Sequence, residues 1–153
     1  EYMYDTARLA HKQGLNNVLV SAGYVNEKPL RELAEYLDAA NIDLKSFSDD
    51  TYRNFNKATL EPVLRTLLIL NEMNIHLEIT LLLIPGINTD ENMQHKMFHW
   101  LTTNGLSHCP LHISRFFPTY KMRNSEPTPL LQMRQAQSIA HEEGVEHVYL
   151  GNV

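Results

Sequence analysis

Asp43 and Lys45 are the two residues whose types and spacing point most directly to chemistry. They stand two positions apart in residues 41–46 (NIDLKS), a segment with the length and composition of a strand. Alternate residues of a strand point to the same face, so the carboxylate and the ammonium group would lie side by side. Such a pair either binds a ligand with charged groups or forms an ion pair that fills the interior. The residues alone favour neither interpretation.

Two further polar residues stand at the ends of predicted strands, where ligands bind in proteins built from βα repeats. Ser21 opens the segment Ser21-Ala22-Gly23, which could admit the polar groups of a ligand or form an ordinary turn. Arg115 carries five N–H donors in a fixed fork, which suits a carboxylate or phosphate as well as a salt bridge at the surface. His95 and His99 stand four residues apart, but no Glu lies between them in the position that a zinc helix requires.

Helical and strand patterns alternate along the chain and would position these residues. Apolar residues at helical spacing separate five short strands, predicted at residues 17–23, 41–46, 77–83, 110–115 and 147–150. This order predicts an α/β fold with a parallel sheet and a single domain over residues 1–153. A doubly wound sheet is apolar on both faces because helices cover both. One polar face, with Asn41, Asp43 and Lys45 opposite Ile42 and Leu44, instead favours a partial (β/α) barrel.

The composition limits the classes of function. Apolar residues make up 43% and charged residues 20% of 153 residues, as in ordinary globular domains. A net charge of −5 argues against a nucleic-acid surface, and we expect neither a signal peptide nor a membrane span. Cys109 is the single cysteine, which excludes an internal disulfide, suggests the cytoplasm, and excludes an all-cysteine iron–sulfur site built from these residues alone. Because five strands cannot close an eight-stranded barrel, we expect the domain to be truncated at both ends.

Several segments, in order and at compatible spacing, resemble a known family. They are residues 41–47 (NIDLKSF), 82–88 (LLIPGIN), 112–122 (HISRFFPTYKM) and 148–153 (VYLGNV). Together they resemble the radical S-adenosylmethionine (radical SAM) enzymes of the pyruvate formate-lyase activating type, and within these the AmmeMemoRadiSam system proteins. The resemblance runs over essentially the whole chain.

The resemblance implies a partial barrel that binds S-adenosylmethionine and a [4Fe–4S] cluster held by a CxxxCxxC loop. A 5′-deoxyadenosyl radical then abstracts hydrogen from a substrate, which makes the enzyme an oxidoreductase. Asp43 and Lys45 match the cofactor-contacting Asp and Lys of this family, and the segments that carry Ser21, Arg115 and Phe117 would line the same pocket. Phe117 replaces a cofactor-contacting histidine of the activating enzymes. No CxxxCxxC is present, so the cluster ligands would lie outside these residues and the chain alone would be inactive.

Two other functions fit the same residues. In a class I aldolase-type barrel, Lys45 would form a Schiff base with a carbonyl substrate. In a non-catalytic docking domain, an apolar surface would be exposed where further strands belong. The sequence does not identify the substrate, which could be a protein. An uncovered edge strand would also let the chain associate with itself.

Overall fold

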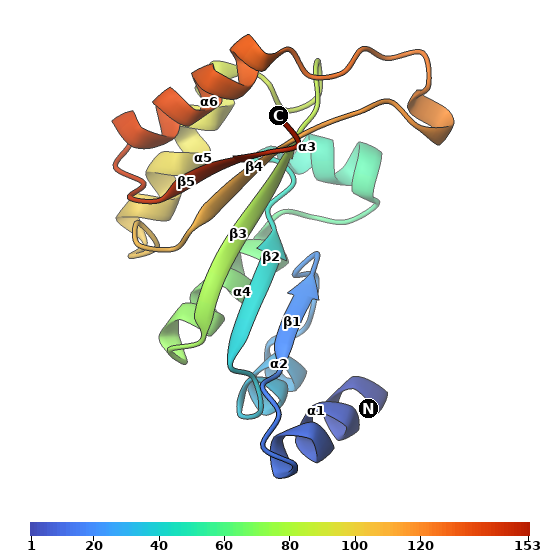
Figure 1. Ribbon diagram of the computed structural model, residues 1–153, viewed down its shortest axis with the longest axis vertical. Helices are drawn as coiled ribbons and strands as arrows, with labels where there is room; N and C mark the ends of the chain where they lie inside the picture. Colours follow the sequence, from blue (N-terminus) through green and yellow to red (C-terminus); the bar gives the residue numbers. More distant parts are fainter.

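The computed structural model describes all residues 1–153 and contains five strands separated by helices (Figure 1). The strands are β1 (Val18–Ser21), β2 (Ala39–Asp43), β3 (His76–Leu83), β4 (Leu111–Arg115) and β5 (Val148–Gly151). The main helices are α1 (Tyr2–Lys12), α2 (Glu27–Ala34), α4 (Glu61–Glu72), α5 (Glu91–Thr103) and α6 (Leu130–Glu142). Short helical segments are α3 (Asp49–Thr51), the π-helical turn η1 (Tyr52–Asn56) and the 3₁₀ turn η2 (Tyr120–Met122).

The five strands form one parallel sheet in the order β1-β2-β3-β4-β5. Figure 1 shows the strands side by side in chain order, with α5 and α6 next to each other along β4 and β5. Crossovers between parallel strands are almost always right-handed, so sequential strand order places the connecting helices on one face of the sheet. This confirms the predicted α/β fold of the partial-barrel type.

The two faces of the sheet differ as the sequence predicts. Along β3, exposure alternates: Leu77, Ile79 and Leu81 are buried, whereas Glu78 and Thr80 are only half-buried. The buried side chains join a cluster of 27 core residues contributed by the strands and by the helices that cover them. The opposite face has no second layer and carries the polar side chains. Any site that uses strand side chains therefore lies on this uncovered face.

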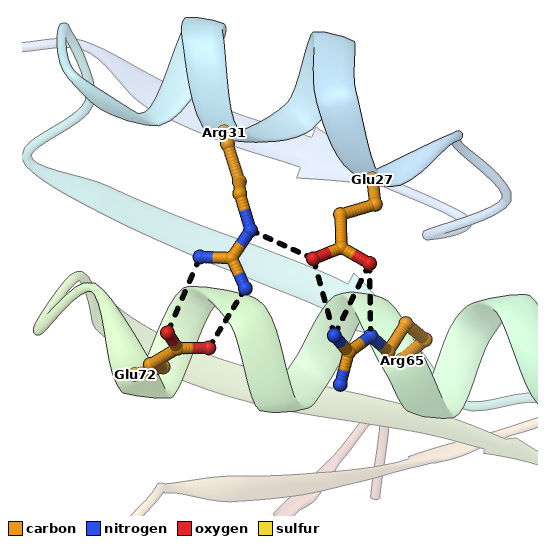
Figure 2. A network of polar contacts seen from close by, with 4 residues as sticks. All are labelled: Glu27, Arg31, Arg65 and Glu72. Carbon is orange, nitrogen blue, oxygen red and sulfur yellow. Dashed lines mark hydrogen bonds and ion pairs between the residues drawn. The ribbon is translucent and has the colours of Figure 1, made fainter.

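A network of charged side chains ties α2 to α4 (Figure 2). Arg31 donates to Glu27 at 2.9 Å and to Glu72 at 2.8 Å, and Arg65 donates to Glu27 at 3.1 Å. The hydrogen bond from Arg31 lowers the pKa of both glutamates, and Arg65 adds to the effect on Glu27. These side chains are well exposed, so water screens the pairs and they act mainly to align two helices that already share the core.

Relative to the elements predicted from the sequence, the structure has one strand at shifted residues and three additional short helical segments. The second strand was expected at residues 41–46 but lies at Ala39–Asp43, so Lys45 follows the strand instead of ending it. The short segments α3, η1 and η2 were not expected, because each has too few residues for a helical repeat to show. None of the helices has both the length and the apolar character needed to cross a membrane.

Candidate functional site

Asp43 and Lys45 form an ion pair at the carboxyl end of β2. Lys45 Nζ lies 2.8 Å from Asp43 Oδ2, and the two side chains are 37% and 36% exposed. Both project from the uncovered face, because the intervening Leu44 is buried in the core. The pair is therefore open to a ligand on one side. Such a pair is complementary to a zwitterionic ligand, because the ammonium group of Lys45 can bind the ligand's carboxylate and the carboxylate of Asp43 can bind its ammonium group.

A pocket of about 260 Å³ adjoins Lys45. Its walls come from the end of β3 and from three segments that follow strands, and they include Phe55, Leu82, Ile84 and Met122. Phe55 and Leu82 are 61% and 40% exposed, so the pocket wall presents apolar surface to a ligand. None of these four residues is among the site residues that the sequence predicts. Leu82, Ile84 and Met122 do lie in the segments 82–88 and 112–122 that carry the family resemblance, whereas Phe55 has no such signal.

Ser21 does not lie with Asp43 and Lys45. It is paired in register with Ile42, whose side chain is in the core, so Ser21 points to the helix-covered side of the sheet. Its Oγ accepts a hydrogen bond of 3.1 Å from the N–H of Gly23. A Cβ on Gly23 would lie 2.8 Å from Ile42 Cγ2, so the space at this glycine is filled by the core. Ser21 Oγ thus helps to close the turn after β1, and core side chains fill the space beside Gly23.

Arg115 and Phe117 lie together after the end of β4. The Arg115 guanidinium carbon is 4.9 Å from the centre of the Phe117 ring, and Arg115 Nε donates to the Thr128 carbonyl at 2.7 Å. Arg115 is paired with Leu83, so it also starts from the helix-covered side of the sheet. No hydrogen bond or ion pair joins either residue to Asp43 or Lys45. Arg115 makes no salt bridge and keeps N–H donors free, and Phe117 is 48% exposed.

A second charged cluster lies on the uncovered face, centred on Glu78 of β3. His112 Nε2 is 2.9 Å from one carboxylate oxygen of Glu78, and His76 Nε2 is 3.5 Å from the other. Burial alone would raise the pKa of Glu78, but the hydrogen bond and charge of His112, followed by the hydrogen bonds of His76 and Asn41, lower it on balance. His112 also stacks on Tyr149, with ring centres 5.5 Å apart. Both carboxylate oxygens of Glu78 are thus already engaged.

Cys109 is buried in the core, and burial raises the pKa of its thiol to about 11. A thiol with this pKa is protonated near neutral pH, whereas metals and iron–sulfur clusters are bound by thiolates. No group of three or more His, Cys, Asp or Glu side chains in the chain has an arrangement that could hold a metal ion.

The comparisons with known proteins agree with this fold. Residues 1–98 match the model of the Radical SAM superfamily, so the chain belongs to that superfamily. An uncharacterized protein of Methanocaldococcus jannaschii is 40% identical over 155 residues, which cover 100% of this chain and 45% of that protein. The chain thus spans somewhat less than half the length of the curated relative it matches.

Two solved structures share the fold. A domain of pyruvate-formate lyase-activating enzyme from Bacteroides vulgatus superposes with a TM-score of 0.81 at 20% identity, covering 99% of this chain and 90% of that chain. A radical SAM methyltransferase from Sphaerobacter thermophilus gives a TM-score of 0.73 at 12% identity, covering 94% of this chain and 44% of that chain. At these identities the likeness concerns the fold. It agrees with the resemblance to activating enzymes that the sequence indicates.

Proposed function

We propose that these residues form the S-adenosylmethionine-binding part of a cytoplasmic radical SAM oxidoreductase of the pyruvate formate-lyase activating type. The observation that carries the proposal is the open Asp43–Lys45 pair on the uncovered face of the sheet, at the strand ends of a member of this superfamily. Lys45 would hold the carboxylate of the methionine part, and Asp43 its ammonium group or a ribose hydroxyl. Ser21, Arg115 and Phe117 would add contacts from the ends of β1 and β4; Ser21 Oγ accepts a hydrogen bond in the turn after β1, and Arg115 packs against Phe117.

The iron–sulfur cluster does not fit within these residues. Cluster ligation needs several thiolates, and the chain has one cysteine, which is buried and protonated. In this family, S-adenosylmethionine bound to a reduced [4Fe–4S] cluster supplies a 5′-deoxyadenosyl radical. The residues of this chain bind and orient the cofactor, and their half-exposed side chains leave one side open to the hydrogen donor. We expect the 153 residues alone to be catalytically inactive, and we propose that the substrate, which could be a protein, is bound with help from other residues.

The proposed role of Lys45 can be tested by binding two related ligands to the chain. S-Adenosylmethionine carries the amino-acid part that Lys45 would contact, whereas 5′-methylthioadenosine lacks it. Lys45→Ala is expected to weaken binding of S-adenosylmethionine about tenfold or more, the usual loss for a hydrogen bond to a charged group. The same change should leave the affinity for 5′-methylthioadenosine unaltered. Isothermal titration calorimetry measures both affinities.

The matched control is Lys28→Ala, which removes an exposed lysine of α2 far along the chain from the pair. This variant should bind both ligands like the original chain. If Lys45→Ala binds S-adenosylmethionine undiminished, Lys45 does not hold the carboxylate. Equal losses for both ligands would mean that the substitution disturbs the pocket as a whole.

An aldolase-type role for Lys45 requires a neutral amine, because only the free amine attacks a carbonyl. Lys45 Nζ is already paired with Asp43 at 2.8 Å, and this charge pair is complementary to a charged ligand, so the geometry favours ligand binding over Schiff-base formation. Borohydride treatment with a carbonyl compound such as pyruvate should therefore leave Lys45 unmodified. A covalent adduct on Lys45 in the mass spectrum would reverse this preference.

A further inference from the structure

The peptide groups of Lys45 are held by two buried side chains instead of by the sheet. The last ladder hydrogen bond of β2 is donated by the Leu44 N–H to the Thr80 carbonyl, at 2.9 Å. Beyond it, the Lys45 N–H donates to the Tyr52 hydroxyl at 3.1 Å, and the Lys45 carbonyl accepts from Asn88 Nδ2 at 2.8 Å. Both backbone groups of one residue are therefore fixed, although the residue stands outside the strand.

Asn88 is 1% exposed, and its side-chain amide is fully engaged. Besides the Lys45 carbonyl, its Nδ2 donates to the Leu82 carbonyl at 2.8 Å, and its Oδ1 accepts from the Ile84 N–H at 2.6 Å. Asn88 thus joins the end of β2 to the end of β3 and to the turn after it. Because a buried amide loses much when a partner is removed, this arrangement has little freedom to shift.

Tyr52 is 2% exposed and reaches Lys45 from a different loop. Burial raises its pKa to about 12, so the phenol is neutral at physiological pH. The loop around it is tied at both ends: Ser48 Oγ accepts from the Thr51 N–H at 3.3 Å, and Asp49 Oδ1 accepts from the Leu60 N–H at 2.9 Å. The π-helical turn that begins at Tyr52 is of a kind often found near functional sites.

We propose that Tyr52 and Asn88 are positioning residues, which fix the backbone of Lys45 so that its ammonium group is directed beside Asp43 and toward the ligand. This inference rests on the proposed function, in which Lys45 binds an anionic group of the cofactor. If the backbone of a lysine just beyond a strand end were mobile, binding a ligand would cost conformational entropy. When the backbone is already fixed in the free protein, binding does not carry that entropic cost. Neither residue needs to touch the ligand for this effect.

The proposal is tested with Tyr52→Phe and Asn88→Ala, and with Thr66→Val as the matched control. Thr66 is also buried, and its hydroxyl donates to the Gly23 carbonyl at 2.7 Å, so Thr66→Val removes a comparable hydrogen bond that does not involve Lys45. Tyr52→Phe should weaken binding of S-adenosylmethionine about five- to tenfold and Asn88→Ala by more, whereas Thr66→Val should change it less than about twofold. Binding is measured well below the melting temperature of every variant.

A second readout does not depend on the cofactor. The two Hε protons of a lysine are inequivalent in ¹³C-edited NMR spectra when its ammonium group is held in one position, and they coincide when the side chain rotates freely. They should be distinct for Lys45 in the original chain and in Thr66→Val, and should coincide in Tyr52→Phe and Asn88→Ala. Asp43→Asn removes the ion pair directly, and its spectrum gives the smallest Hε shift difference expected for a freely rotating Lys45.

The outcomes separate the two proposals. If Tyr52→Phe and Asn88→Ala melt at lower temperature but keep distinct Hε signals and the original affinity, the two residues are merely structural and the inference is wrong. If the original chain does not bind S-adenosylmethionine at all, the proposed function of this chain fails. In that case the Hε signals alone decide whether Tyr52 and Asn88 orient Lys45.

Discussion

The two faces of the sheet follow different physical rules, although they share the same backbone. On the helix-covered face, Ile42 and Ile79 are buried among other apolar side chains and make no polar contact. On the uncovered face, polar side chains find partners on the same face: Asp43 with Lys45, Glu78 with His112, and Thr80 with Asn41. One face supplies stability, and the other supplies the chemical groups.

The uncovered face is itself divided into two kinds of charged cluster. Glu78 lies within the strand ladder, and both of its carboxylate oxygens face histidine rings. Lys45 lies beyond the ladder, its ammonium group has one carboxylate partner, and a pocket adjoins it. Similar exposure of the side chains, between 34% and 37% for Glu78, His112, Asp43 and Lys45, does not separate these clusters. What separates them is the number of free donors and acceptors.

The largest expected effect compares neighbouring residues on the two faces of β2. Ile42→Ala removes a fully buried side chain and should lower the free energy of unfolding by about 2–4 kcal/mol, because a cavity forms in addition to the lost transfer energy. Asn41→Ala, one residue away, should cost less than about 1 kcal/mol, since it removes only half-exposed polar contacts, the hydrogen bond that Asn41 accepts from Thr80 and its contact with Glu78. Urea denaturation followed by circular dichroism measures both. Equal costs would contradict the division between the faces.

This division could be predicted from the sequence because strand side chains alternate strictly. The alternation of polar and apolar side chains in residues 41–43 predicts which face each one occupies. The structure buries Ile42 and leaves Asn41 and Asp43 half-buried, as predicted. Ser21 and Arg115 were chosen because they end predicted strands, but only every second residue at a strand end faces the uncovered side. The register that pairs Ser21 with Ile42, and Arg115 with Leu83, puts them on the other side.

The residues around Lys45 show what sequence reasoning could not reach. Tyr52 contacts Lys45 from seven residues further along the chain, and Asn88 does so from 43 residues further along. Neither contact follows from a repeat or from a motif with a known spacing. Both depend on how two loops close over the end of β2, which is set by packing in three dimensions.

The next effect concerns the edge of the sheet. β1 pairs only with β2, and on its uncovered face Val18 and Val20 are 60% and 75% exposed. We propose that the chain associates with itself through this edge, as apolar edge strands do when nothing covers them. Val20→Lys should weaken that association roughly tenfold, because a charge must then be buried between copies. Sedimentation velocity over a range of concentrations gives the monomer fraction.

Tyr149→Lys is the control for this experiment, since it places a lysine on the opposite edge strand, β5, at a side chain that is 53% exposed. Only Val20→Lys should shift the monomer fraction if β1 forms the contact. A chain that is monomeric at every concentration would rule out association through the edge, and equal effects of both variants would point to general charge repulsion.

The smallest expected effect is the pH dependence of the Glu78 cluster. The pKa of Glu78 is lowered in the folded chain, so its contribution to stability is present above the unfolded pKa of about 4.3 and is lost as the pH falls through the folded value. The difference in unfolding free energy between the original chain and Glu78→Gln should therefore be constant down to about pH 4.3 and shrink below it. Because Glu78 is 35% exposed, this difference should stay below about 1 kcal/mol.

Glu143→Gln sharpens this last comparison. Glu143 also faces two histidines, with His95 Nδ1 at 2.8 Å and His99 Nδ1 at 3.2 Å, but it joins α5 to the end of α6 outside the sheet. The hydrogen bond to His95 is the main cause that lowers its pKa, so its contribution should fade over the same acidic range. If Glu78 interacts only with its neighbouring histidines and not with a ligand, both variants should leave the affinity for S-adenosylmethionine unchanged. A loss of affinity in Glu78→Gln alone would mean that the ligand site extends along the uncovered face to the middle of β3.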